Sequence, residues 1–145
     1  MLAPTASAGF AGRAYTLGPG GAEAMRMARV LLVDDDPVVR NTIKELLVLE
    51  GHDVISASSG GVAMRHFEEQ PAELLIANVY MAKGDGLKFV AELNRIDPEL
   101  SIIALAPSPV PQGYLSAARA FGASEIFLKP VDTDELLRAV RRLLR

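Results

Sequence analysis

Polar side chains able to bind a cation or a phosphoryl group follow three apolar runs of this chain. Asp34 and Asp35 come directly after the run VLLV, Asn78 ends the run LLIAN, and Lys129 follows the run IFL. Neighbouring carboxylates suit a hard cation such as Mg²⁺, and a cation together with a lysine ammonium can neutralise charge that develops in phosphoryl transfer. This chemistry requires the three positions to meet in space, which depends on the elements that precede them.

The same residue types also have a purely structural explanation. Two acids at the start of a helix complement its dipole and supply a cap. Two carboxylates about 4 Å apart repel each other by about 4 kcal/mol at an effective dielectric constant of 20, and a lysine relieves that repulsion with no phosphate present. Residue types alone therefore leave both explanations open for Asp34, Asp35 and Lys129.

Five short apolar runs recur from residue 29 onward. Turn residues and then a helix-like pattern follow each run, which is the rhythm of βα units. The runs are mostly aliphatic or β-branched with little polar alternation, as in parallel strands covered on both faces. They begin near Arg29, His52, Glu73, Ser101 and Glu125.

Capping signals predict the helices between these runs. Asp36 is placed to cap a first helix that Pro37 opens and Gly51 ends. Prolines end the second and third helices and delay the start of the fourth. These further helices are predicted over residues 60–70, 87–96 with Asp85 as its cap, 112–122, and from Asp132 to the end of the chain.

The alternation of five strands with five helices predicts a doubly wound α/β fold with right-handed crossovers. A parallel five-stranded sheet then lies between two layers of helices, as a three-layer sandwich. Ligands of such sheets bind beyond the carboxyl ends of the strands. We therefore expect one crevice to be lined by Asp34, Asp35, Asn78, Ala106 and Lys129.

Residues 1–28 lack this pattern. The segment is rich in Ala and Gly, contains Pro4 and Pro19, and carries only three charged side chains. It also lacks the basic start and the apolar run of a signal peptide. We predict a disordered leader over residues 1–28 and a folded domain over residues 29–145.

Composition narrows the classes of function. The 145 residues include 15 Lys and Arg against 18 Asp and Glu, a net charge of −3, which favours one domain and argues against nucleic-acid binding by bulk electrostatics. No apolar stretch approaches the ~20 residues that cross a bilayer, so no membrane association is expected. The chain has no Cys, which excludes a thiolate metal site and fits a reducing, cytoplasmic location.

Three motifs occur in order on the first, third and fifth predicted strands: VLLVDDDP, LIANVYMAKGDG and IFLKP. Together they resemble the receiver domain of two-component response regulators, over about residues 29–145. The resemblance implies a flavodoxin-like sheet of order 2-1-3-4-5 and a role in phosphorelay signalling, with no enzymatic activity of its own. It also implies that Asp34 and Asp35 bind Mg²⁺ with the backbone of Tyr80, beside Lys129 and Pro130.

Four positions depart from the family pattern. Asn78 stands where the family has the aspartate that accepts a phosphoryl group, and an amide is neither anionic nor a competent nucleophile. Ala106 replaces the hydroxyl residue after the fourth strand, Ile126 replaces the switch aromatic on the fifth, and Ala82 replaces a proline. Because the pocket has one carboxylate fewer, we expect Mg²⁺ to bind more weakly.

These departures predict a degenerate receiver, a single-domain signalling protein that binds a protein partner without phosphorylation at Asn78. The expected partner is a histidine kinase, another regulator or an effector, and the expected state is a monomer or a weak homodimer. One alternative keeps phosphorylation, through Asp35, through Asp85 or through an Asn78 that has deamidated to aspartate. A remote alternative is a Mg²⁺-dependent phosphatase that uses the motif Asp34-x-Asp36.

Overall fold

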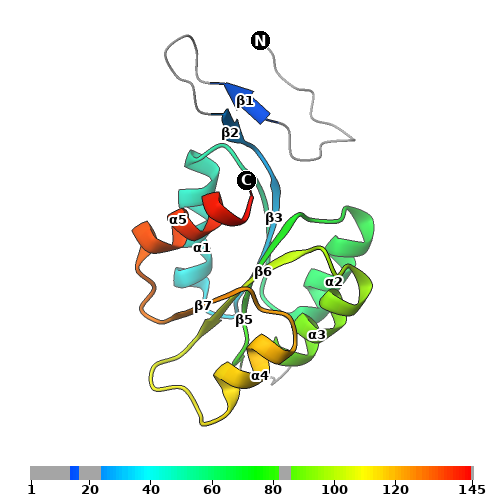
Figure 1. The fold of residues 1–145 in the computed structure, drawn as a ribbon, viewed down its shortest axis with the longest axis vertical. Coiled ribbons are helices and arrows are strands. Elements are labelled where there is room, and N and C mark those ends of the chain that lie inside the picture. Colours follow the sequence, from blue (N-terminus) through cyan, green and yellow to red (C-terminus); the bar gives the residue numbers. More distant parts are fainter. Residues whose placement is uncertain (1–13, 17–23, 82–85, 145) are drawn as a thin grey trace.

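The computed structural model of the protein describes residues 14–16, 24–81 and 86–144. Over these residues, strands and helices follow one another as Figure 1 shows. In chain order the elements are β1 (Ala14–Thr16), β2 (Ala24–Arg26), β3 (Arg29–Val33), α1 (Pro37–Leu49), β4 (Asp53–Ala57), α2 (Gly60–Glu69), β5 (Leu74–Asn78), α3 (Gly86–Ile96), β6 (Ser101–Ala106), α4 (Tyr114–Ala120), β7 (Glu125–Leu128) and α5 (Thr133–Leu143).

Strands β3 to β7 form one parallel five-stranded sheet in the order β4-β3-β5-β6-β7. Counted from β3, the first predicted strand, this is the order 2-1-3-4-5, so the predicted doubly wound, flavodoxin-like fold is confirmed. Figure 1 shows α1 and α5 on one face of the sheet and α2, α3 and α4 on the other. The central strands β3 and β5 are buried along their whole length, which explains why their sequences show no polar alternation.

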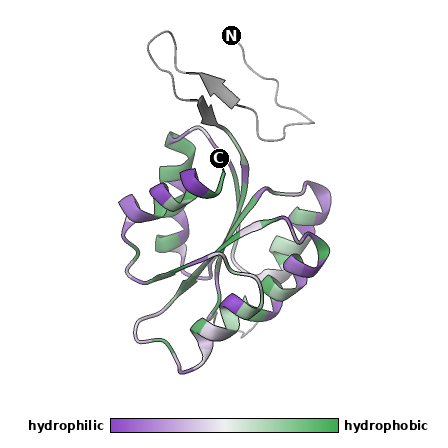
Figure 2. Ribbon diagram, in the orientation of Figure 1, coloured by the Kyte–Doolittle hydropathy of each residue, from purple (hydrophilic) through white to green (hydrophobic). Residues whose placement is uncertain are grey.

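Each face of the sheet packs its own hydrophobic core. Along β3, Leu31 and Val33 point into the core beneath α2, α3 and α4, whereas Val30 and Leu32 point into the core beneath α1 and α5. This alternation follows from the two-residue period of a strand. Figure 2 shows the matching pattern on the helices, whose hydrophobic and hydrophilic residues lie on different sides.

Capping chemistry explains where α1 begins and ends. Oδ1 of Asp36 accepts hydrogen bonds from the backbone N–H of Val38 at 2.9 Å and of Val39 at 3.4 Å. The helix ends at Leu49, and the chain then turns through Gly51, whose φ of 96° is a conformation that favours glycine. The predicted limits of α1 are therefore confirmed.

The other helices begin and end within two residues of the predicted positions. α4 starts at Tyr114, after the proline-containing loop that delays it. Asp132 caps α5 through a hydrogen bond of 3.1 Å from the backbone N–H of Glu135. Asp85, the predicted cap of α3, and Ala82 lie outside the described residues. Of the helices in the described part of the chain, none has the length and apolar character needed to cross a bilayer.

Part of the segment predicted to be a disordered leader pairs as a small sheet. β1 and β2 are antiparallel partners, so the prediction of disorder does not hold for them, whereas residues 1–13 and 17–23 lie outside the described residues. Strands of three residues are too short to leave a readable period in the sequence. The folded domain also includes Ala28, which is buried and donates its N–H to Nδ1 of His52 at 3.1 Å.

α3 begins against the end of β5, where its first residue has no room for a side chain. A Cβ on Gly86 would lie 2.5 Å from the backbone oxygen of Asn78 and 2.7 Å from two backbone carbons of Val79. Backbone atoms cannot move aside by changing rotamer, so a side chain at this position must displace α3 from β5. Gly86 therefore sets how closely α3 approaches the end of this strand.

We predict that Gly86→Ala lowers the free energy of unfolding by about 1–3 kcal/mol, the usual cost of overpacking. The matched control is Gly61→Ala in α2, because a Cβ on Gly61 meets nothing within 4 Å. Alanine has the higher helix propensity, so the control should raise the free energy of unfolding by about 0.5–1 kcal/mol. Urea unfolding measures both values, and equal stability of the two variants would contradict the close packing of α3 on β5.

Candidate functional site

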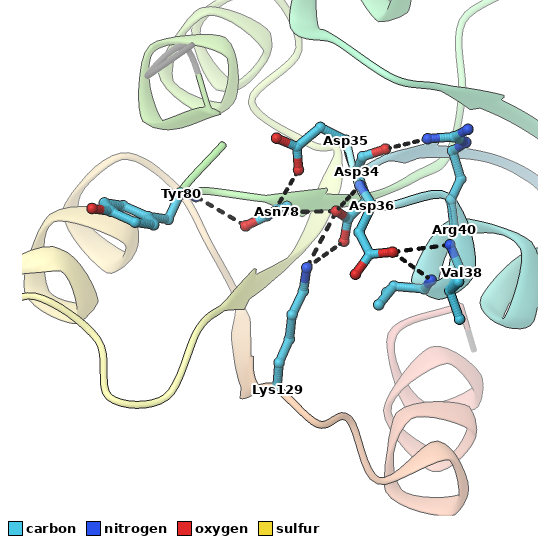
Figure 3. A network of polar contacts seen from close by, with 9 residues as sticks. Asp34, Asp35, Asp36, Val38, Arg40, Asn78, Tyr80 and Lys129 are labelled. Atoms are coloured by element: carbon cyan, nitrogen blue, oxygen red, sulfur yellow. Dashed lines mark hydrogen bonds and ion pairs between the residues drawn. The ribbon is translucent and has the colours of Figure 1, made fainter. Parts of the chain in front are cut away.

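The carboxyl ends of β3, β5 and β7 meet at one edge of the sheet (Figure 3). Asp34 and Asp35 follow β3, Asn78 is the last residue of β5, and Lys129 follows β7. Parallel strands end on the same edge of a sheet, so residues far apart in the chain become neighbours there. The structure therefore brings together the acids, the amide and the ammonium that the sequence analysis singled out.

The carboxylate of Asp34 lies at the centre of this cluster and is fully buried. Its Oδ1 accepts hydrogen bonds from the backbone N–H of Asp36 at 2.9 Å and from Nδ2 of Asn78 at 3.2 Å. Nζ of Lys129 lies 3.2 Å from Oδ1 and 2.9 Å from Oδ2. Burial of a carboxylate is costly unless it is paired and hydrogen-bonded, so Asp34 depends on contacts from three segments of the chain.

The Asn78 side chain bridges the acids and the following loop through the two ends of its amide. Nδ2 donates to Oδ1 of Asp34 at 3.2 Å and to Oδ1 of Asp35 at 3.4 Å. The amide Oδ1 accepts a hydrogen bond of 3.0 Å from the backbone N–H of Tyr80. The neighbours select this orientation because carboxylates only accept hydrogen bonds and a backbone N–H only donates one. Asn78 thus donates one hydrogen bond to each of the two acids.

Lys129 is held by the sheet at one end and by Asp34 at the other. Its backbone N–H donates to the carbonyl oxygen of Ala106 at 2.8 Å, and its side chain is 20% exposed. The ion pair with Asp34 therefore lies mostly out of water, where the attraction between opposite charges is less screened. Ala106, at the end of β6, is fully buried, and its methyl group can form no hydrogen bond with the cluster.

The three consecutive acids after β3 have different surroundings. Asp34 is buried, whereas Asp35 and Asp36 are exposed, and Asp36 is engaged as the cap of α1. Arg40, in the first turns of α1, donates from Nη1 to the backbone oxygen of Asp34 at 2.7 Å. The sequence analysis missed Arg40, although its position one helical turn after the capping acid was a usable signal. Its contact ties the acidic turn to α1.

The chain matches the family model of the response regulator receiver domain over residues 30–141. It belongs to this family of receiver domains. The matched range begins at the second residue of β3 and includes the other four strands of the five-stranded sheet and the acidic, amide and lysine positions at its carboxyl edge. The resemblance carried by the three sequence motifs is therefore confirmed, and with it the assignment to two-component signalling.

Two relatives show that similar receivers occur both as nearly the whole of a protein and as a small part of a longer one. The receiver is 30% identical over 117 residues to the chemotaxis protein CheY of Bacillus subtilis, which covers 80% of this chain and 97% of CheY. It is 33% identical over 114 residues to the transcriptional regulatory protein GlrR of Escherichia coli, which covers 78% of this chain and 25% of GlrR. The chain thus spans a quarter of the length of GlrR.

Solved structures share the fold of this receiver. A crystal structure of NtrX from Brucella abortus in complex with ADP superposes with a TM-score of 0.73 at 26% identity, covering 81% of this chain and 26% of that one. A two-component response regulator from Clostridium difficile superposes with a TM-score of 0.76 at 18% identity, covering 82% of this chain and 97% of that one. The second likeness concerns the fold alone.

The carboxyl edge of this receiver offers oxygen ligands for a divalent cation. Asp34 and Asp35 supply carboxylates, and Oδ2 of Asp34 is buried without a hydrogen bond from the described residues, although Lys129 pairs with it. Oδ1 of Asn78 is a neutral oxygen at the same edge, and it accepts the hydrogen bond from the Tyr80 N–H. In the described part of the chain, no three His, Cys, Asp or Glu side chains gather around a common point. A cation here would have two carboxylates as its charged ligands.

Ala106 and Ile126, which stand at the positions of the family's hydroxyl and aromatic residues, lie in apolar surroundings. Ile126 on β7 packs against the core beneath α2, α3 and α4, the core that includes Ala106.

Tyr80 contacts Tyr114 at the start of α4, with ring centroids 5.1 Å apart and planes at 83°, an edge-to-face arrangement. In Figure 3 the ring of Tyr80 points away from the acids. The sequence analysis missed this pair because its members belong to different segments.

Loss of the Lys129 ammonium should leave the buried Asp34 carboxylate uncompensated. We predict that Lys129→Met lowers the free energy of unfolding by about 3 kcal/mol, since removal of one partner from a buried ion pair leaves an unpaired charge. The double variant Asp34→Asn/Lys129→Met should recover most of this loss because it has no buried charge. Urea denaturation at neutral pH measures all the variants.

The control for this prediction is Lys88→Met on the exposed surface of α3. Its free energy of unfolding should change by less than about 0.5 kcal/mol, as is usual for surface positions. If Lys129→Met were as stable as Lys88→Met, the ion pair with Asp34 would not support the fold.

Proposed function

We propose that this receiver acts by binding a protein partner and carries no phosphoryl group on residue 78. The observation that supports this function is the amide of Asn78 at the end of β5, 3.2 Å from Asp34 and 3.4 Å from Asp35. An acyl phosphate forms when a carboxylate oxygen attacks phosphorus, and a neutral amide is not a competent nucleophile for that step. On this proposal the domain is a degenerate, atypical receiver, or pseudo-receiver, and not an enzyme.

The residues around Asn78 also favour the loss of a phosphorylation switch. Ala106 has no hydroxyl group with which to contact a phosphoryl oxygen, and Ile126 has no aromatic ring to change position with it. The ammonium of Lys129 is already paired with Asp34. The acceptor carboxylate, the hydroxyl group and the aromatic ring are all missing. Loss of the switch as a whole explains these three substitutions together, whereas a single isolated substitution does not.

Weak Mg²⁺ binding belongs to the same proposal. Two carboxylates attract a divalent cation less strongly than three. Nζ of Lys129 and Nδ2 of Asn78 also compete for the oxygens of Asp34 and Asp35 that a cation would need. We therefore expect Mg²⁺ to bind more weakly than in a receiver with an aspartate at the position of Asn78.

The proposed partner is a protein of a two-component system: a histidine kinase, another regulator or an effector. The match covers 97% of CheY, a chemotaxis protein, which supports a receiver that works without a catalytic domain beside it. GlrR is a transcriptional regulatory protein, but only a quarter of it is matched, and we propose no nucleic-acid partner for this domain. We place the domain in the cytoplasm as a monomer or weak homodimer. In the described part of the chain, the large hydrophobic side chains exposed for contact are Val38, Val48, Leu49, Tyr80, Ile96, Leu115, Phe121 and Leu128.

The test is intact-mass spectrometry of the purified protein after incubation with Mg²⁺ and acetyl phosphate. The native protein should keep its mass, whereas Asn78→Asp should gain the mass of one phosphoryl group because it regains a carboxylate nucleophile. A labelled native protein would contradict the proposal. Peptide mapping would then identify the acceptor as Asp35, Asp85 or a deamidated residue 78.

Asn78→Asp alone should respond only weakly to phosphorylation. With Ala106 and Ile126 unchanged, the new phosphoryl group lacks the hydroxyl and aromatic partners that would transmit its presence. We predict that acetyl phosphate shifts few amide NMR signals of this variant beyond the carboxyl edge, and that adding Ala106→Thr increases their number. Shifts throughout the spectrum of the single variant would show that the two substituted positions do not limit switching.

A further inference from the structure

We propose that the Asn78 amide makes this receiver respond to a divalent cation, and that Tyr80 transmits the response to α4. The inference rests on the proposed function, because it requires residue 78 to remain an unphosphorylated amide. The inference concerns a reversible half turn of the Asn78 side-chain amide, in which the donor Nδ2 and the acceptor Oδ1 exchange places. A carboxylate has two acceptor oxygens and cannot make such an exchange.

The amide has opposite ends facing two different partners. Nδ2 faces the carboxylates of Asp34 and Asp35, and Oδ1 faces the backbone N–H of Tyr80. Asn78 is almost wholly buried. Its bond to Asp34 is buried, and its bonds to Asp35 and to the Tyr80 N–H are partly buried. Each end is satisfied only while the amide keeps this orientation.

A cation bound by both carboxylates favours the opposite orientation. The N–H groups of Nδ2 and a cation need the same oxygens of Asp34 and Asp35, and an amide nitrogen has no lone pair to offer a metal. The terminal amide torsion is broad and roughly two-fold, so a half turn places Oδ1 where Nδ2 was. Oδ1 is then a neutral oxygen ligand beside the two carboxylates. The cation also has to displace or share the ammonium of Lys129, whose Nζ lies 2.9 Å from Oδ2 of Asp34.

The same half turn removes the acceptor of the Tyr80 N–H. Nδ2 then faces that N–H, and two donors cannot bond to each other. The Tyr80 N–H is only partly buried, but loss of its acceptor still favours an arrangement in which the peptide of Tyr80 turns or shifts toward another partner. The orientation of the Asn78 amide is thereby coupled to the position of the Tyr80 backbone, whose nitrogen lies 3.0 Å from Oδ1.

The ring of Tyr80 extends this coupling to α4. Its edge-to-face contact joins it to Tyr114, the first residue of the helix. The N-cap of α4 is Gly113, which makes no side-chain capping bond, and the N–H of Tyr114 donates to the carbonyl oxygen of Pro111 at 3.1 Å. A shift of the Tyr80 ring therefore acts on the first residue of the helix. Ala106, also near the carboxyl edge, is a buried methyl that offers no polar route of its own.

The experiment is a titration of the full-length native protein with magnesium chloride, followed by amide NMR. Potassium chloride at matched ionic strength controls for screening. The Asn78 side-chain signals and the Tyr80 amide signal should shift with Mg²⁺ only. The amide signals of Tyr114–Ala120 should shift with the same midpoint, because one binding event moves both regions.

Two variants of Tyr80 distinguish transmission of the response to α4 from binding of Mg²⁺ itself. Tyr80 is 47% exposed, and Tyr80→Ala removes the ring while keeping the backbone N–H. It should retain the Mg²⁺-dependent shift of Asn78 and lose most of the shift in α4. Tyr80→Phe keeps the ring and should behave like the native protein. Undiminished α4 shifts in Tyr80→Ala, or native spectra in which Mg²⁺ moves no α4 signal, would overturn the inference.

The titration contains no phosphoryl donor, so its failure is distinct from failure of the proposed function. A native protein that gains mass with acetyl phosphate overturns both proposals, because residue 78 or a neighbour is then an acceptor. A native protein that keeps its mass but shows no Mg²⁺-dependent α4 shift overturns only the coupling through Tyr80.

Discussion

The burial of one carboxylate, that of Asp34, is the constraint on which the carboxyl edge of this receiver depends. Parallel strands with both faces covered leave the residue after the central strand β3 inside the molecule. A buried carboxylate must be compensated where it stands. Lys129 after β7, Asn78 on β5 and the turn that leads into α1 all supply that compensation, so three segments are tied together through one side chain.

An amide at position 78 changes what this edge of the sheet requires. A third carboxylate would add to the repulsion between Asp34 and Asp35 and would need a cation to offset it. Asn78 donates to both acids instead, and Lys129 supplies a positive charge. Protein groups thus supply both the hydrogen bonds and the positive charge that face the two acids. The same contacts oppose a cation, which has to displace donors before it reaches the oxygens.

Much of the fold could be predicted because its signals are local. Continuous apolar runs indicated strands buried on both faces, and Asp36 with Pro37 predicted the start of α1. The pairing of β1 with β2 left no such signal, because each strand is only three residues long. The contacts of Arg40 and the Tyr80–Tyr114 pair were also missed, since each depends on where a side chain points after the chain has folded.

The sequence by itself determined which chemical groups stand at the carboxyl edge, because the end of each strand could be read from the apolar runs. It thereby determined that two acids, an amide, a methyl group and an ammonium stand at this edge. Only the tertiary structure decided how those groups are used: which acid is buried, which end of the Asn78 amide faces the acids, and that Tyr80 reaches α4. These outcomes depend on burial and hydrogen-bond direction, which are properties of the surroundings of a residue and not of its type.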